Sequence, residues 1–232
     1  MEDTICAVST APGAGGIAVI RISGPEAIAI CNTIFVPRTA GKGLLSQKAY
    51  TLRYGSIRRG EELIDEVLIA LFRAPHSFTG EDTVEITCHG SVYIQQQIMQ
   101  LLIERGCRSA LPGEYTQRAF MNGKMDLSQA EAVADLIAST SAGQHRLALN
   151  QMRGGFSHEL KNLREQLLHI TSLMELELDF SDHEELEFAD RSELSTLAAH
   201  IETVISRLAN SFSVGNRSEE HTSELQSPMF IS

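Results

Sequence analysis

The hydrophobic period of the chain changes near residue 112, and this change limits the folds that the chain can adopt. Before that point, short β-like runs such as 17–23 (IAVIRIS) and 83–88 (TVEITC) alternate with segments of helical spacing. From about residue 114 onward, apolar residues recur at helical spacing throughout. This arrangement predicts an α+β fold, in which an N-terminal domain with a mixed sheet is followed by part of an α-helical bundle.

The first part of the chain contains enough turn and cap signals to place its elements. Pro25 suits the first turn of a helix, Gly106 suits a helix C-cap, and the charged segment 59–62 suits a turn between two strands. We expect strands at 17–23, 50–58, 66–72 and 83–88, and helices at 25–35 and 91–105.

The second part predicts three helices, at about 128–138, 157–178 and 192–212. Asp126 or Ser128 is expected to cap the first of them, with Glu131 completing a Ser-x-x-Glu capping box. The second helix has an apolar seam that needs a partner helix, made by Leu160, Leu163, Leu167, Ile170 and Met174. We therefore expect a helical bundle that is incomplete within this chain.

Charge, cysteine spacing and hydropathy exclude several classes of protein. A net charge of −11 argues against a wide nucleic-acid-binding surface, so any RNA contact would need a local basic patch. The four cysteines are scattered without a Cys-x-x-Cys pair, which favours buried, reduced thiols over a zinc or disulfide site. No apolar run is long enough to cross a bilayer, and the acidic N-terminus is unlike a secretory signal, so a cytoplasmic protein is expected.

The glycine-rich segment 11–16 (APGAGG) resembles a phosphate-binding loop only superficially, because it precedes a strand and not a helix. A tight turn that uses a positive φ is the favoured interpretation. The sequence contains no Gly-Lys-Ser or Gly-Lys-Thr, so it has no nucleotide-binding P-loop.

Arg21 and Glu85 are the strongest candidates for a functional site, because each lies inside an otherwise apolar strand. Two interpretations stay open. The two charges could simply pair with each other inside the domain. Alternatively, they could face a pocket, where a carboxylate accepts two N–H groups from a pterin or purine edge and an arginine meets a carbonyl or carboxylate oxygen.

The segment 111–127 joins the two parts of the chain and places Arg118 and Lys124 near the junction, where ligand sites often form. Lys124 could reach a ligand carboxylate, or it could be an ordinary solvated lysine. The turn-rich loop 74–82 could lie over a pocket.

Two other features are interpreted as structural. Cys88 and His89 are neighbours in a strand, so they should point to opposite faces and should not form a catalytic pair. The acidic run 179–190 lacks the spacing of a calcium loop and is expected to be a solvated inter-helix loop.

Three separated motifs, APGAGGIAVIRISG, PHSFTGEDTVEITCHG and PGEYTQRAFMNGKMDLSQAEAVADLI, resemble the MnmE (TrmE) family of bacterial tRNA-modification GTPases in order and spacing. The resemblance extends through LDFSDHEELEF to about Asn216. It implies an N-terminal folate-binding and homodimerisation domain similar to the aminomethyltransferases. The implied ligand is 5-formyltetrahydrofolate or a related one-carbon tetrahydrofolate, with contacts that fall on Arg21, Glu85 and Lys124. Of these, Glu85 is the best candidate for the pterin edge.

The resemblance also implies an activity and partners for a longer protein. Members of the family are GTP hydrolases that need Mg²⁺ and K⁺ and contain an inserted G domain. With the flavoprotein MnmG (GidA), in a heterotetramer, they modify carbon 5 of the wobble uridine, position 34, in certain tRNAs. The chain lacks the G-domain motifs, so it should keep folate binding and dimerisation, with no catalytic residue, no metal ligand and no GTPase activity of its own.

The resemblance divides the chain into a folate-binding and dimerisation domain (1–117), the first part of a helical domain (118–216) and a tail (217–232). The tail contains RSEEHTSELQS, which resembles a sequencing adapter translated in frame and is expected to be disordered. Two alternative functions are a stand-alone folate-dependent one-carbon transferase and a non-catalytic dimerisation module. The first would lack the signature Asn-Gly-Lys-Met-Asp-Leu at 122–127, and the second would not bind folate.

Overall fold

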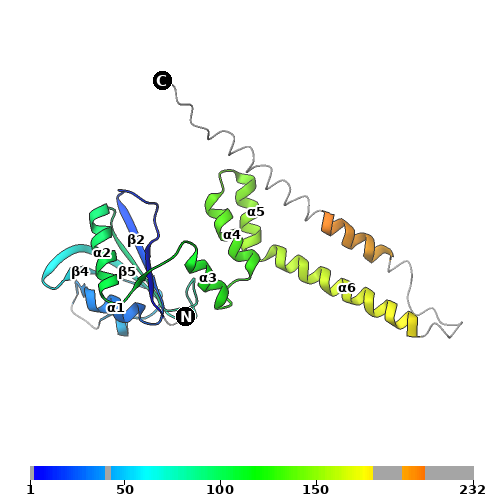
Figure 1. Cartoon of the computed structure of the whole chain (residues 1–232), viewed down its shortest axis with the longest axis horizontal. Coiled ribbons are helices and arrows are strands. Elements are labelled where there is room, and N and C mark those ends of the chain that lie inside the picture. The colour runs from blue at the N-terminus through cyan, green and yellow to red at the C-terminus, as the bar shows by residue number, and fades with distance from the viewer. Residues whose placement is uncertain (1–2, 40–42, 180–194, 207–232) are drawn as a thin grey trace, which may run out of the picture. The chain divides into compact units, whose positions relative to one another are not determined.

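The protein consists of two compact units, Met1–Ala130 and Glu131–Ser232 (Figure 1). The structure is a computed structural model, and it describes residues 3–39, 43–179 and 195–206. Of the acidic run expected to form a solvated loop at 179–190, residue 179 is the last residue of a helix, and the rest lies outside the described residues, as does the tail at 217–232.

The first unit is built on a seven-stranded sheet in the order β3-β4-β5-β6-β2-β1-β7. Neighbouring strands are antiparallel except β1 and β7, which run parallel, so the expected mixed sheet is confirmed. The strands are β1 (Ile5–Val8), β2 (Ile17–Ser23), β3 (Phe35–Pro37), β4 (Thr51–Arg59), β5 (Glu62–Phe72), β6 (Thr83–His89) and β7 (Arg108–Ser109).

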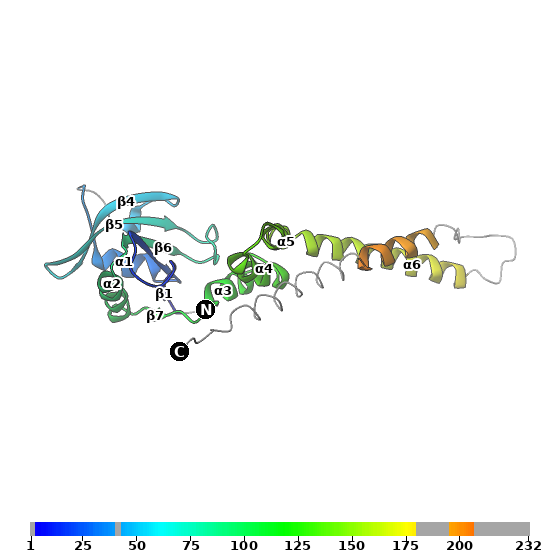
Figure 2. The ribbon, with the colours of Figure 1, turned by 90° about the horizontal axis from the view of Figure 1, so that it is seen from above.

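Two helices, α1 (Ala27–Ile34) and α2 (Val92–Glu104), lie on the same side of this sheet (Figure 2). Period-two alternation explains why, because Ile20, Ile86 and Ile69 are register partners that point to the helices and are fully buried. Their neighbours along the strands point to the opposite face, which carries charged and partly exposed side chains. A short 3₁₀ turn, Leu44–Ser46, and helix α3 (Glu114–Met121) complete the unit.

All four expected strands and both expected helices of this unit are present, with shifted ends. The helix expected at 25–35 is shorter than expected, because Phe35 leaves the helix to begin β3 and pair with β4. The segment 59–62 is a turn only in part, since Glu62 already belongs to β5. Strands β1 and β7 were not expected individually, because they are four and two residues long and depend on distant partners.

The remaining helices are α4 (Leu127–Ala138), α5 (Ala142–Met152), α6 (Gly155–Asp179) and the helical residues 195–206. Of the two expected caps of α4, Asp126 is confirmed, but the expected Ser-x-x-Glu capping box is wrong. Asp126 accepts from the backbone N–H of Gln129 at 2.9 Å, and the Gln129 side chain accepts from the N–H of Asp126 at 2.9 Å. Gln129, three residues after Asp126, therefore takes the place expected for Glu131.

Helix α5 was not expected, because its sequence has no continuous apolar stripe. Ser141 caps it by accepting a hydrogen bond from the N–H of Gln144 at 3.2 Å. The expected helices at 157–178 and 192–212 correspond to α6 and to 195–206, and the ends of the latter lie outside the described residues.

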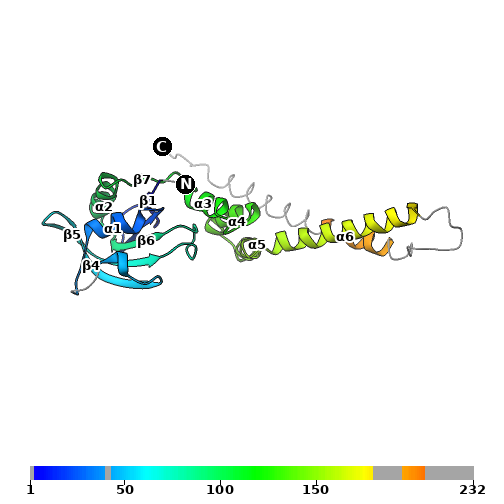
Figure 3. The same ribbon diagram turned by 90° about the horizontal axis from the view of Figure 1, so that it is seen from below.

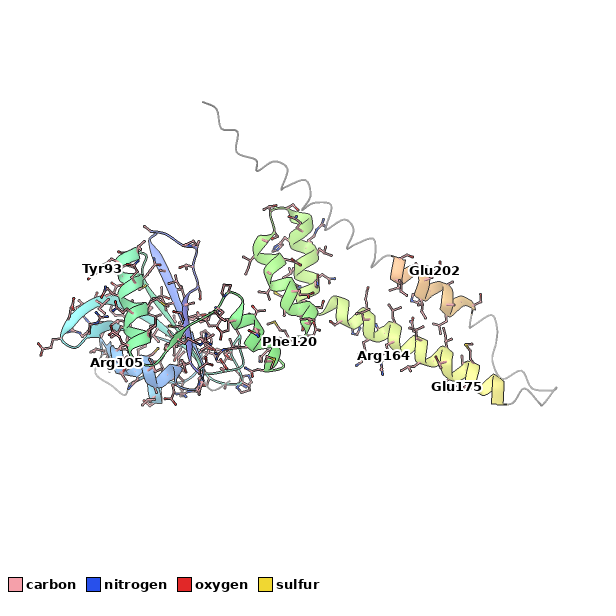
Figure 4. The ribbon with its side chains drawn as sticks, in the orientation of Figure 1. Tyr93, Arg105, Phe120, Arg164, Glu175 and Glu202 are labelled. Atoms are coloured by element: carbon pink, nitrogen blue, oxygen red, sulfur yellow. The ribbon has the colours of Figure 1, made fainter. Side chains whose placement is uncertain are left out.

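The seam of α6 is only partly covered in the described part of the chain. Leu163 is buried, whereas Leu160, Leu167 and Met174 remain exposed. Residues 195–206 run beside α6 (Figure 3), and exposed charged side chains such as Arg164, Glu175 and Glu202 project from these two helices (Figure 4). None of the described helices is both long enough and apolar enough to cross a membrane.

Candidate functional site

Arg21 and Glu85 lie directly opposite each other in the register of β2 and β6. Arg21 Nε donates to Glu85 Oε1 at 2.9 Å, and an Nη of Arg21 lies 2.7 Å from the same oxygen. The pair is on the sheet face opposite α1 and α2, and its side chains are 27% and 25% exposed. The structure thus brings these two predicted site residues together, as an ion pair at the surface and not in the core.

Two aromatic rings contact the Arg21 guanidinium. The rings of Phe78 and Tyr115 each lie 5.6 Å from the guanidinium carbon, at cation–π distance. Tyr115 also donates its hydroxyl to the backbone carbonyl of Arg21 at 2.6 Å. Burial raises the pKa of the Tyr115 hydroxyl, so that ring stays neutral. The guanidinium is consequently held in place by a carboxylate and two rings.

Both charged groups of the pair retain hydrogen-bonding capacity. Among the described residues, no side chain or backbone group bonds Glu85 Oε2, and none bonds the second Nη of Arg21. A carboxylate oxygen can accept N–H donors, and a guanidinium N–H can donate to a carbonyl or carboxylate. This site can therefore take a planar polar ligand with donors and an acceptor along one edge.

The loop between β5 and β6 carries Phe78 and is tied down at several points. Asp82 Oδ1 accepts from the N–H of Ala74 at 2.9 Å and closes the loop at its base. The side-chain amide of Asn122 donates to the carbonyl of Thr79, next to Phe78, at 2.7 Å. The turn-rich segment expected near a pocket thus supplies one wall of the site.

Lys124 contacts this same loop, and in the described part of the chain its side chain does not bond the ion pair. Its Nζ donates to the carbonyl of Pro75 at 2.9 Å, and its stem lies against Gly80. The side chain is exposed. Its assignment as a ligand contact stays a prediction, since a surface lysine bound to a carbonyl would look the same.

Arg118, which the sequence placed near the junction, lies in a charge cluster that was not expected from the sequence. Arg118 is fully buried, and its guanidinium pairs with Asp3 at 2.7 Å, Glu114 at 3.1 Å and Glu81 at 3.2 Å. Arg108 also pairs with Asp3 and Glu114, each at 2.6 Å. The Glu-x-x-x-Arg spacing of 114 and 118 could have indicated one pair of this cluster, because residues four apart on a helix are neighbours.

The cluster shifts the acidity of its carboxyl groups. Hydrogen bonds from the Arg108 side chain, the backbone N–H of Leu111 and the Arg118 side chain lower the pKa of Glu114 to about 2 despite its burial. The same arginines lower the pKa of Asp3. These carboxylates are therefore charged at neutral pH, and they compensate the buried guanidinium.

The glycine-rich segment is a turn, as expected. Gly13 has a φ of +118°, and the N–H of Gly15 donates to the carbonyl of Gly90 at 3.0 Å. The side-chain amide of Gln95 donates to the carbonyls of Gly13 and Gly90, each at 3.2 Å. The loop leads into β2, and the N–H of Gly15 is used to join it to the end of β6.

The interpretation of the cysteines and of the Cys88–His89 pair is also confirmed. All four cysteines are buried and free. Cys88 points into the core, whereas the exposed His89 bonds Asp65 through Nδ1 at 2.7 Å and through its backbone N–H at 2.8 Å. Within the described ranges, no group of three or more His, Cys, Asp or Glu side chains could hold a metal ion.

The fold and the site define an α+β domain with a surface Arg–Glu pair suited to a polar ligand, joined to a helical segment. Two family models match the chain: "GTP-binding protein TrmE N-terminus" over residues 4–124 and "MnmE helical domain" over residues 127–223. The chain belongs to the MnmE (TrmE) family.

Curated relatives extend the match over nearly the whole chain. The chain is 80% identical over 214 residues to the tRNA modification GTPase MnmE of Parabacteroides distasonis, covering 92% of this chain and 46% of that protein. It is 71% identical over 215 residues to the protein of the same name from Bacteroides fragilis, and 55% identical over 215 residues to that from Porphyromonas gingivalis. These matches cover 93% of this chain and 46% and 45% of those proteins, so the chain spans a little under half their length.

Proposed function

We propose that this chain is the folate-binding N-terminal part of a GTPase that modifies carbon 5 of the wobble uridine, position 34, in certain tRNAs. The name of its relatives, tRNA modification GTPase, supports the activity proposed for the longer protein. The observation that carries the folate assignment is the surface ion pair of Arg21 and Glu85, with open hydrogen-bonding positions on both partners.

The donors and acceptors present fit a reduced pterin. The free oxygen of Glu85 can accept from the N–H groups along the pterin edge, and Arg21 can donate to the pterin carbonyl. Lys124 is proposed to meet the one-carbon region or the glutamate tail. The ligand of this site is 5-formyltetrahydrofolate or a related one-carbon tetrahydrofolate, and it would supply the one-carbon unit for the tRNA modification.

GTP hydrolysis, with its Mg²⁺ and K⁺, belongs in this proposal to a G domain of the longer protein. The proposed partners are tRNA, MnmG in a heterotetramer and a second copy of this chain, and the proposed location is the cytoplasm. We assign dimerisation to the folate-binding domain, residues 1–117, and place the helical domain at 118–216. The exposed apolar side chains Val36, Leu52, Tyr54 and Leu68 on the open face of the sheet support a protein contact there.

One observation favours a second candidate function, a non-catalytic dimerisation module. Arg21 and Glu85 already satisfy each other at 2.7 Å, as a purely structural pair would. Folate binding separates the two candidates. A stand-alone one-carbon transferase is disfavoured, because the match to the MnmE helical domain begins directly after the first domain.

The test is a calorimetric titration of the chain with 5-formyltetrahydrofolate. Replacing Glu85 by Gln should weaken binding about tenfold or more, since the pterin edge loses a charged acceptor, a difference of about 1.4 kcal/mol. The free energy of unfolding should change by less than about 1 kcal/mol, because the pair is partly exposed.

Glu104→Gln is the matched control, since Glu104 is half-exposed and pairs with Arg59 at 3.4 Å on the helix-covered side of the sheet. It should leave the folate affinity unchanged. Absence of binding at millimolar ligand by the unsubstituted chain would favour the dimerisation module.

A further inference from the structure

Arg118 stands out because it is a fully buried arginine that does not reach the proposed ligand site. Its two Nη atoms bond three carboxylates and also the backbone carbonyl of Asp3 at 2.8 Å. An arginine is buried at this depth only when such partners compensate its charge. The groups that it holds together are therefore fixed relative to one another.

One of these partners belongs to the loop that carries Phe78. Glu81 accepts from Arg118 at 3.2 Å and from the hydroxyl of Ser23, at the end of β2, at 2.8 Å. The backbone carbonyl of Glu81 accepts from the Ser77 hydroxyl at 2.6 Å. The position of Phe78, between Ser77 and Glu81, is thus set by a carboxylate that Arg118 holds.

The helix of Arg118 supplies the second aromatic contact of Arg21. Tyr115 lies three residues before Arg118 in α3, and its hydroxyl bonds the backbone carbonyl of Arg21. Because Arg118 ties α3 to Asp3 near the start of β1, the helix cannot shift along the sheet without breaking an ion pair of the buried Arg118.

We infer that Arg118 is a positioning residue for Arg21: through Glu81 it places Phe78, and through α3 it places Tyr115, against the Arg21 guanidinium. The importance of this for ligand binding rests on the proposed folate function. A guanidinium held by two rings presents its free N–H groups in one direction, and a small misplacement of such a group weakens binding.

A general stabilising role would have a different signature. If Arg118 and Glu81 only stabilise the fold, substituting them lowers stability. It then also weakens ligand binding by the same factor whether or not Phe78 is present. If they act through Phe78, removing the Phe78 ring abolishes most of the effect on binding, because the coupling passes through that contact.

The experiment is a double-substitution cycle in the full 232-residue chain with two readouts. Glu81→Gln and Phe78→Ala are made singly and together, and the dissociation constant for 5-formyltetrahydrofolate is measured by calorimetry. The ¹⁵N–¹H resonance of Arg21 Nε is recorded without ligand, because it reports the ring contacts directly. Glu104→Gln is again the control, and thermal unfolding is followed for every variant.

Glu81→Gln is expected to weaken folate binding about fivefold with Phe78 present and less than about twofold in the Phe78→Ala background. The Arg21 Nε resonance should move in Glu81→Gln and stay in place in Glu104→Gln. Arg118→Lys, which keeps the charge but loses the fork of donors, should reproduce both effects and serves if Glu81→Gln does not fold.

Equal losses of affinity in both backgrounds, with an unmoved Arg21 resonance, would overturn the inference and leave Arg118 a structural residue. A chain that binds no folate but shows the moved resonance would overturn the folate assignment, while the positioning of Arg21 by Arg118 would stand.

Discussion

At the scale of single residues, the protein uses two arginine–glutamate arrangements with different physical roles. Arg21 and Glu85 share one oxygen at the surface and keep bonding capacity free. Arg118 is enclosed, and its two Nη groups are directed at three carboxylates and a carbonyl. A partly exposed pair contributes little to stability and can exchange partners for a ligand, whereas breaking a buried cluster leaves an uncompensated charge.

The acid stability of the protein should follow Glu114. Its pKa is lowered to about 2 in the folded state. Its contribution to the free energy of unfolding is therefore fully present above about pH 5 and is lost as the pH falls toward 2. The shift corresponds to about 3 kcal/mol of unfolding free energy. Urea denaturation at pH 7, 5, 4 and 3 measures it.

Glu114→Gln should lower the free energy of unfolding at pH 7. Between pH 5 and 3 this free energy should fall less than it does for the unsubstituted chain, and the pH dependence that remains comes from Asp3. Glu62→Gln, at the exposed start of β5, is the control. A Glu114→Gln variant with the full acid dependence would contradict this assignment.

At the scale of elements, the site exists because β2 and β6 pair in one register. Arg21 lies opposite Glu85, and the same register stacks Ile20 on Ile86 in the core. A shift of one residue would turn the charges toward the helices and the isoleucines toward solvent. The turn at the start of β2 contributes to this register, since its Gly15 backbone bonds that of Gly90 at the end of β6.

Gly90→Ala should therefore destabilise the first unit. An added Cβ would overlap the carbonyl oxygen of Gly15, with its carbonyl carbon 2.6 Å away, so one of the two backbones must move. We expect a loss of about 1–3 kcal/mol in the free energy of unfolding, measured by chemical denaturation.

Gly16→Ala is the matched control in the same turn. A Cβ at Gly16 meets no atom within 4 Å, and its φ lies outside the left-handed region. Its effect should stay within about 0.5 kcal/mol. Equal effects of the two substitutions would mean that the close contact of the two backbones is unimportant.

At the scale of the whole molecule, each unit leaves apolar surface uncovered in the described part of the chain. In the first unit this is the sheet face opposite α1 and α2, where Leu52 is 70% and Leu68 is 42% exposed. In the second it is the seam of α6. Surfaces of this kind mark contacts with other chains or other parts of a chain. The chain spans 46% of the length of its relative from Parabacteroides distasonis.

Leu68→Glu should shift the chain from dimer to monomer, because it places a charge in the centre of the proposed apolar contact. Sedimentation velocity over a concentration series measures the change. Leu45→Glu, at a leucine that is more exposed than Leu68 and lies in the 3₁₀ turn, should leave the dimer intact. A monomeric unsubstituted chain, or a Leu68→Glu chain that remains dimeric, would exclude this surface.

The chain itself should release no phosphate from GTP above a protein-free blank in a buffer that contains Mg²⁺ and K⁺. Phosphate-binding loops need Gly-Lys-Ser or Gly-Lys-Thr leading into a helix, and the sequence contains neither. The relative from Parabacteroides distasonis provides the positive control. Measurable turnover by the present chain would disprove the prediction.

Sequence alone was sufficient for the α+β class, the four longer strands, the first two helices and the polar pair inside the strands. These are local properties, because hydrophobic period and turn residues act within about ten positions. Strand β7, with two residues, and helix α5, without an apolar stripe, carried too weak a local signal.

Only the tertiary structure decided which charges meet. Arg118 lies 115 positions from Asp3 and 37 from Glu81 along the chain, and nothing in the local sequence links them. It also decided that Phe78 and Tyr115 contact Arg21, and that the Arg21–Glu85 pair faces away from the helices. The hydrophobic period and residue propensities determine the secondary structure of each segment. Which residues contact one another depends on the long-range packing of the whole sheet.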